Sequence, residues 1–169
     1  RALPSVRVVL KTAVSLADLK AKTRRNTYII MRHGEAAHNL TETWSIVPGT
    51  NDVLTDAGKQ HVKEVAVALE GKIDLIITSP FTRAQETARI TADALGIAVD
   101  AIITDPRLGE WNVGAQFNGQ VMDEYFKLRN TVDDRYKFKV EGGESYADVF
   151  TRAGEFLYEL EAKYKDKKI

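Results

Sequence analysis

The fold of this chain is decided by one stretch, Thr27-Tyr28-Ile29-Ile30-Met31-Arg32-His33-Gly34-Glu35. Its first five residues are apolar, aromatic or β-branched, which predicts a short buried strand over Thr27–Met31. Arg32 and His33 follow at the carboxyl end of this strand, next to a glycine. Open α/β sheets bind their ligands just outside the carboxyl ends of the strands. The stretch therefore predicts an α/β protein with a functional site at His33.

The rest of the chain alternates predicted strands and helices. Two further apolar runs predict strands over Ile73–Thr78 and Ala98–Thr104. Such alternation is typical of a mostly parallel sheet with helices on both faces, so we expect a three-layer α/β/α fold. Helices are expected from a Thr55 cap to Gly71, from a Ser79-Pro80 start to Gly96, over Met122–Arg129, and from a capping box of Ser145 and Asp148.

Charge and composition narrow the class of protein. The chain has 24 basic and 24 acidic side chains, a balance that argues against nucleic acid as a general partner. Residues 1–26 hold seven basic side chains and one acidic one, which predicts a basic extension or linker and the one segment where nucleic acid could bind. Within it, Val6–Leu10 is a candidate strand. The chain has no cysteine, secretory signal or long apolar run, so we expect a cytoplasmic protein without membrane spans.

The residues after the first strand have the chemistry of phosphoryl transfer. Arginine binds phosphate oxygens through its forked guanidinium, and a neutral imidazole can attack phosphorus. Glycine lets the backbone approach a ligand closely. Arg32 and His33 are therefore candidates for a phosphate clamp and a nucleophile. Arg83 follows the end of a second predicted strand, so both arginines can converge at the same crevice.

Further motifs follow in a fixed order, and together with residues 32–35 they resemble the phosphoglycerate mutase-like branch of the histidine phosphatase superfamily. The resemblance extends from about Asn26 to the last residue and implies a phosphoglycerate mutase-like fold over residues 27–169. The motifs that carry it are Asn39, Leu54-Thr55-Asp56-Ala57-Gly58-Lys59-Gln60, Thr78-Ser79-Pro80-Phe81-Thr82-Arg83-Ala84-Gln85-Glu86-Thr87-Ala88, Leu108-Gly109-Glu110-Trp111-Asn112-Val113-Gly114 and Glu141-Gly142-Gly143-Glu144-Ser145.

The resemblance implies a metal-independent phosphatase that hydrolyses small phosphomonoesters without a cofactor, through a phosphohistidine on His33. Glu110 would be the general acid, which needs desolvated or negatively charged surroundings, and the neighbouring Trp111 could supply apolar cover. Glu35 is expected to be a hydrogen-bonding brace, and His61 a surface residue. The positions expected to bind the substrate or its phosphate, besides Arg32 and Arg83, are Asn39, Gly49 and Thr50.

Members of this family carry a second active-site histidine on a strand end after the last long helix. The histidines here are His33, His38 and His61, so we expect the final strand and helix of the family to be missing from residues 27–169. Either the sheet then lacks a strand beside Thr27–Met31, or Val6–Leu10 fills that slot.

The missing histidine leaves an alternative function open. The domain could be a catalytically incomplete binder of phosphoryl ligands, or a structural domain excised from a larger multidomain protein such as an aminoacyl-tRNA synthetase. A phosphoglycerate mutase is a weaker alternative, because the 21 residues from Gln120 to Val140 are short and mixed in charge where mutases carry a longer basic insertion. Sugar phosphates, phosphoglycerate-like acids, nucleotides and phosphoproteins all remain candidate substrates.

Overall fold

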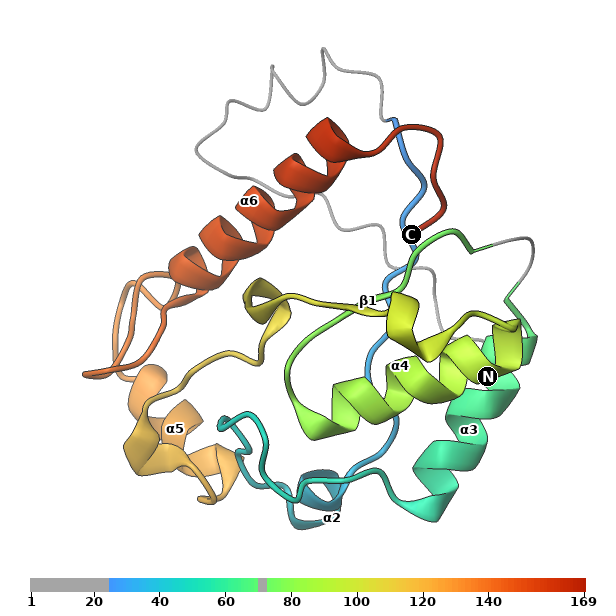
Figure 1. The fold of residues 1–169 in the computed structure, drawn as a ribbon. Coiled ribbons are helices and arrows are strands. Elements are labelled where there is room, and N and C mark those ends of the chain that lie inside the picture. The colour runs from blue at the N-terminus through green and yellow to red at the C-terminus, as the bar shows by residue number, and fades with distance from the viewer. Residues whose placement is uncertain (1–24, 70–72) are drawn as a thin grey trace.

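The computed structural model describes residues 25–69 and 73–169, which form an α/β fold (Figure 1). A long α6 helix, Tyr146–Lys163, lies on one side of the central strand, and two packed helices lie on the other. This arrangement gives the three layers expected from the sequence. The elements in chain order are α2 (Ala37–Thr41), α3 (Asp56–Val67), β1 (Ile77–Thr78), α4 (Thr82–Leu95), β2 (Ile103–Thr104), α5 (Met122–Arg129) and α6, with 3-10 turns at Val99–Ala101, Pro106–Leu108 and Ala115–Phe117.

The regular sheet is smaller than the sequence predicts. In the described part of the chain, β1 pairs in parallel with β2, and Ile77 lies opposite Ile103. The predicted strand over Ala98–Thr104 is therefore too long, because its first residues form a 3-10 turn in which the Ala101 N–H donates to the Ala98 carbonyl. The predicted strand Ile73–Thr78 is likewise reduced to its last two residues. The length of a strand depends on how far two segments run side by side, and the sequence of one segment does not show this length.

Only the first residue of the predicted strand Thr27–Met31 makes a β-bridge, which it forms in parallel with Lys168. The Ile169 N–H donates to the Thr27 carbonyl at 2.8 Å, and the Ile29 N–H donates to the Ile169 carbonyl at 2.7 Å. On its other side, the Lys168 carbonyl accepts from the Asp74 N–H at 2.8 Å. Residues 167–169 thus occupy the place beside Thr27. This pairing was not predicted, and the candidate named for this place, Val6–Leu10, lies outside the described residues.

Most helix boundaries follow local signals, with two exceptions. The predicted end of α3 at Gly71 is too late, because α3 ends at Val67, and Gly71 itself lies outside the described residues. The Thr55 hydroxyl accepts from the Gly58 N–H and caps α3, Ser145 and Asp148 form the capping box of α6, and Gly96 ends α4 with a φ of +67°. The Ser79-Pro80 start is wrong, because α4 begins at Thr82 after an extended N-cap residue. This residue is Phe81, whose ring is buried and lies against the Arg83 guanidinium.

An aromatic core joins the loops that precede α3 and follow β2. The rings of Trp44 and Trp111 meet edge to face at a centroid distance of 5.9 Å, and Tyr125 of α5 lies edge to face against both. Trp111 also stacks on Tyr146 at the start of α6, at 4.5 Å. Such ring pairs add to the free energy gained by burial alone. Trp111, which follows Glu110 in the sequence, therefore anchors the Glu110 loop in the core.

The backbone after the first strand lies directly on α3. A Cβ atom on Gly34 would come within 2.6 Å of Val62 Cγ2 and 2.9 Å of the Gly58 carbonyl oxygen, and a Cβ atom on Gly58 would overlap the Glu35 carbonyl. The Thr55 hydroxyl donates to the Glu35 carboxylate at 2.7 Å, and the Thr55 N–H donates to the Glu35 carbonyl at 2.9 Å. Glu35 is thus a hydrogen-bonding brace, as predicted.

This close approach makes Gly58→Ala a destabilising change, although glycine to alanine in a helix interior usually stabilises. We expect the free energy of unfolding to fall by about 1–3 kcal/mol, the usual cost of overpacking. Urea unfolding monitored by circular dichroism measures the change. Gln60→Ala, at an exposed position of the same helix, is the control and should shift the value by less than about 0.5 kcal/mol. A Gly58→Ala protein as stable as the parent would contradict the packing described here.

Candidate active site

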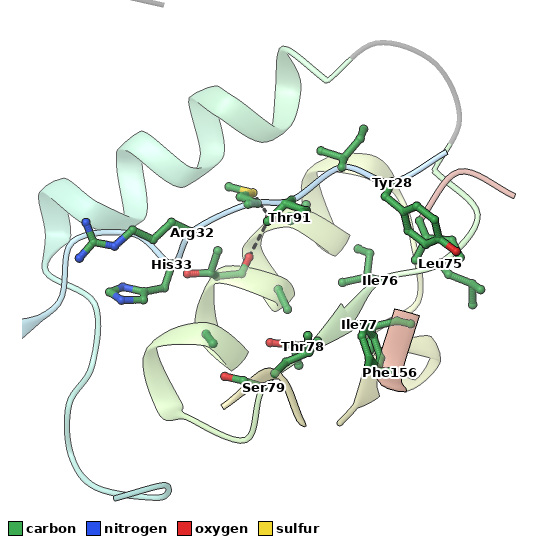
Figure 2. Close-up of a pocket in the computed structure, with 18 of the residues that line it drawn as sticks. Tyr28, Arg32, His33, Leu75, Ile76, Ile77, Thr78, Ser79, Thr91 and Phe156 are labelled. Carbon is green, nitrogen blue, oxygen red and sulfur yellow. Dashed lines mark hydrogen bonds between the residues drawn. The ribbon is translucent and has the colours of Figure 1, made fainter. Parts of the chain in front are cut away.

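Four of the residues predicted to form the site line one cavity of about 490 Å³. The walls of this cavity are mostly apolar and come from residues 28–31, residues 75–78, α4 and α6. Figure 2 shows Arg32 and His33 next to each other at one end, with Tyr28 and Phe156 at the other. The cavity therefore combines a hydrophobic interior with a charged end. The four residues are Arg32, His33, Arg83 and Glu110.

His33 is held in one tautomer by its neighbour. Its Nδ1 atom lies 2.7 Å from the Gly34 carbonyl oxygen, which can only accept, so Nδ1 carries the proton and the lone pair is on Nε2. Burial lowers the pKa of the imidazole below its usual value. The hydrogen bond to the Gly34 carbonyl opposes this change, and the positive charges of Arg83 and Arg32 reinforce it. His33 is consequently neutral near pH 7, the form in which an imidazole is nucleophilic.

Arg83 lies in the first turn of α4 and points into the protein. It is 2% exposed, and its Nη1 atom donates to Asp52 Oδ2 at 2.8 Å and to the Ser45 hydroxyl at 3.3 Å. Its Nη2 atom donates to Glu110 Oε2 at 3.2 Å. The guanidinium also lies over the Phe81 ring, 4.6 Å from the ring centroid. Arg83 is thus a buried cation between two carboxylates, whereas Arg32 is exposed to solvent.

Glu110 has different surroundings from those predicted. Its carboxylate makes an ion pair with Arg83, and its Oε1 atom accepts from the Trp111 N–H at 2.8 Å. The side chain is about one third exposed. The expectation of an apolar or negatively charged setting is therefore wrong for the protein without a ligand. The backbone N–H of Trp111 donates to Glu110, and the Trp111 ring is buried in the aromatic core.

The loop of Glu110 is fixed from α6 by an arginine that the sequence analysis did not single out. Arg152 donates to the backbone carbonyls of Arg107 and Glu110 at 2.5 and 3.2 Å. It also makes a two-pronged pair with Glu144, at 2.7 and 3.0 Å. Arg152 lies seven residues after the Ser145 cap, two helical turns along the same face, and this spacing could have indicated the contact.

Two of the three predicted substrate-binding positions, Asn39 and Thr50, have polar groups engaged in internal hydrogen bonds. The Asn39 carbonyl oxygen accepts from the Ala36 N–H, and its amide nitrogen donates to a histidine ring, both at 2.9 Å. Gly49 has a φ of +76°. The Thr50 carbonyl accepts from the Thr82 hydroxyl at 2.7 Å, which joins it to the start of α4. A role of Asn39, Gly49 and Thr50 in binding substrate stays a prediction.

Two residues missed by the sequence analysis complete the surroundings of Arg83. Asp52 is 8% exposed and bridges Arg83 to His38, which is 7% exposed and lies with its ring centroid 5.4 Å from that of His33. Nothing in the local pattern of the loop marks either residue, since the partners are distant in sequence. His61, by contrast, is exposed on α3 as predicted.

Residues 25–69 and 73–169 contain no group of three or more histidine, cysteine or acidic side chains placed to bind a metal ion. Their helices also include none with the length and hydrophobicity needed to cross a bilayer.

The sequence was compared with known protein families. The profile described as "Histidine phosphatase superfamily (branch 1)" matches residues 28–169. The "Probable phosphoglycerate mutase GpmB" of Yersinia enterocolitica is 40% identical over 87 residues, which cover 50% of this chain and 38% of that protein. "Phosphoserine phosphatase 1" of Hydrogenobacter thermophilus is 28% identical over 142 residues, which cover 80% of this chain and 64% of that protein. The chain therefore matches less than two thirds of the length of either relative.

Solved structures show the same fold. YhfR of Bacillus stearothermophilus superposes with a TM-score of 0.71 at 25% identity, over 85% of this chain and 71% of that one. A mycobacterial glucosyl-3-phosphoglycerate phosphatase in complex with VO3 has a TM-score of 0.66 at 24% identity, over 83% of this chain and 66% of that one. These likenesses confirm the predicted phosphoglycerate mutase-like fold.

The buried His38 and the half-buried His33 should make stability depend on pH between about 7.5 and 5.5. Burial lowers the pKa of both His33 and His38 in the folded protein, so the unfolded chain binds more protons just below pH 6.5. The free energy of unfolding should consequently fall as the pH decreases through this window. Urea unfolding at several pH values measures the slope, which His33→Asn should flatten. The control His61→Asn, at an exposed position, should leave it unchanged, and a parent protein without any slope would refute the expectation.

Proposed function

Because the chain belongs to the histidine phosphatase superfamily, branch 1, we propose that it hydrolyses phosphomonoesters through a phosphohistidine intermediate on His33. The observation that carries this proposal is the hydrogen bond from His33 Nδ1 to the Gly34 carbonyl, which leaves Nε2 with its lone pair at the charged end of the cavity. One relative in the same family is a phosphoserine phosphatase, which is consistent with hydrolysis.

In the first step, His33 Nε2 attacks phosphorus and the bond to the leaving oxygen breaks. Arg32 and Arg83 stabilise the negative charge on the other phosphoryl oxygens. Glu110 donates a proton to the leaving oxygen. In the second step a water molecule attacks the phosphohistidine and gives one of its own protons to Glu110. This step releases phosphate and neutral His33. Nδ1 keeps its proton throughout, because its bond to the Gly34 carbonyl persists.

The ion pair between Arg83 and Glu110 gives a route by which substrate prepares the acid. A phosphoryl dianion carries more charge than a carboxylate and competes with Glu110 for Arg83 Nη2. Once displaced, the Glu110 carboxyl group no longer pairs with Arg83 and lies next to the bound phosphoryl group. Binding of the substrate would thus release from Arg83 the group that we propose as the acid.

The charge for this reaction would come from arginine and imidazole groups, so the proposed activity needs no metal ion. The substrate would be a small phosphorylated compound, and the cavity does not select one class of it. A mutase is the second candidate, favoured by the 40% identity to GpmB over 87 residues. A mutase would pass the phosphoryl group from His33 to a second hydroxyl in place of water. Detection of such transfer to phosphoglycerate by phosphorus NMR would distinguish it from hydrolysis.

The activity prediction concerns p-nitrophenyl phosphate and phenyl phosphate. The protein should release phosphate from both in the presence of EDTA, and acid-labile, base-stable phosphohistidine should be trapped after rapid quenching. His33→Ala should abolish the adduct. Glu110→Gln should slow the reaction of phenyl phosphate by roughly 10²–10⁴-fold, the usual contribution of a general acid. It should slow the reaction of p-nitrophenyl phosphate, which has the better leaving group, by a smaller factor.

His61→Asn is the matched control and should behave as the parent protein does. Loss of activity with EDTA that Mg²⁺ restores would contradict the mechanism. Binding of inorganic phosphate without any turnover would instead support the alternative of a phosphoryl-ligand-binding domain.

A further inference from the structure

His38 lies beside the proposed nucleophile, and both of its ring nitrogens have partners. Its Nδ1 atom is 2.9 Å from Asp52 Oδ2, and its Nε2 atom is 2.9 Å from the amide nitrogen of Asn39. The Asn39 amide has only one possible orientation, because its oxygen accepts from the Ala36 N–H. Its nitrogen must then donate to His38 Nε2, so the proton of the neutral ring is on Nδ1 and points at Asp52.

Asp52 connects this ring to the phosphate clamp. Its Oδ1 atom accepts from the His38 backbone N–H at 3.1 Å and lies 3.1 Å from His38 Nδ1. Its Oδ2 atom lies 2.9 Å from the same Nδ1 and 2.8 Å from Arg83 Nη1. The carboxylate is buried, which raises its pKa, but the hydrogen bonds from His38 and Ser45 outweigh burial and keep it ionised. Donors from His38, Ser45 and Arg83 therefore orient the Asp52 carboxylate together.

The orientation of Asp52 determines which nitrogens of Arg83 face the cavity. With Nη1 bound to Asp52, Nη2 is directed at Glu110, the group that substrate would displace. An Asp52 carboxylate without the donor from the His38 ring would keep only the backbone N–H of residue 38 on that side. It could then rotate and take both terminal nitrogens of Arg83 in a two-pronged pair. Arg83 would then have less capacity to bind a phosphoryl group.

We propose that His38 is a positioning residue, whose Nδ1–H holds Asp52 so that Arg83 presents Nη2 to the phosphoryl group. The proposal rests on the proposed function for the identity of the ligand. In this role His38 acts through Asp52 and not on the reacting atoms. Its effect should consequently appear in the affinity for phosphate and in KM more than in kcat.

Two substitutions with nearly the same shape separate this role from simple packing. His38→Asn places an amide N–H close to the position of Nδ1, and His38→Leu has the same branching without a donor. The Leu variant should bind inorganic phosphate about tenfold more weakly and raise KM for p-nitrophenyl phosphate by a similar factor. The Asn variant should stay within about threefold of the parent. Equal losses in both variants, or none in the Leu variant, would overturn the proposal.

NMR tests the positioning step separately from the activity. The Nη protons of Arg83 should exchange slowly by rotation in the parent and in His38→Asn, and should average in His38→Leu. An unchanged Arg83 signal in the Leu variant would contradict the proposal even if phosphate binds. A parent protein that binds no phosphate, but shows these Arg83 signals, would refute the proposed function and leave the positioning role intact.

The parent protein supplies a test that needs no variant. Long-range nitrogen–proton spectra should show His38 as the Nδ1–H tautomer near pH 7. An Nε2–H tautomer would overturn the proposal, since Asp52 would then have no donor from the ring.

Discussion

The buried guanidinium of Arg83 is the interaction on which the site depends. A charge that is 2% exposed is costly unless it is paired and fully hydrogen-bonded, and removal of one partner leaves an uncompensated buried charge. Asp52 and Glu110 provide the compensation from two loops that are far apart in sequence. Their attraction to one cation therefore brings the loop before α3 and the loop after β2 to the start of α4. Trp44 and Trp111 belong to these two loops, and their shared aromatic core also holds the loops together.

The two carboxylates are not equivalent partners of Arg83. The Asp52 side chain is 9% exposed and has further donors from His38, so it is a fixed partner. The Glu110 side chain is 34% exposed and makes the longer contact, so an anion from solvent can replace it. In the free protein Glu110 satisfies Arg83, and in the proposed complex the phosphoryl group does. The site can thus keep a buried cation stable without substrate and still offer it to substrate, at the cost of displacing one partly solvated carboxylate.

Local signals predicted the parts of this structure that are encoded locally. The cap at Thr55, the capping box at Ser145 and the end of α4 at Gly96 each depend on residues within one turn, and all three are confirmed. Strand lengths and the start of α4 were wrong because they depend on partners elsewhere in the chain. The pair of His38 and Asp52 spans 14 residues of loop, and that of Arg83 and Glu110 spans 27 residues. No periodicity indicates such pairs. The candidate site residues could therefore be chosen from motifs, but the residues that surround them could not be predicted.

The nucleophile and the clamp also share one support, which is Gly34. Its carbonyl accepts from His33 Nδ1, and its N–H donates to the Thr87 hydroxyl at 3.0 Å, which itself donates to the Arg83 carbonyl at 2.8 Å. Its Cα lies against Val62 and Gly58 of α3, with no space for a side chain. The carbonyl that sets the tautomer of His33 is therefore held in place by both α3 and α4. Because Thr87 and Arg83 both belong to α4, the same helix supports the nucleophile and the clamp.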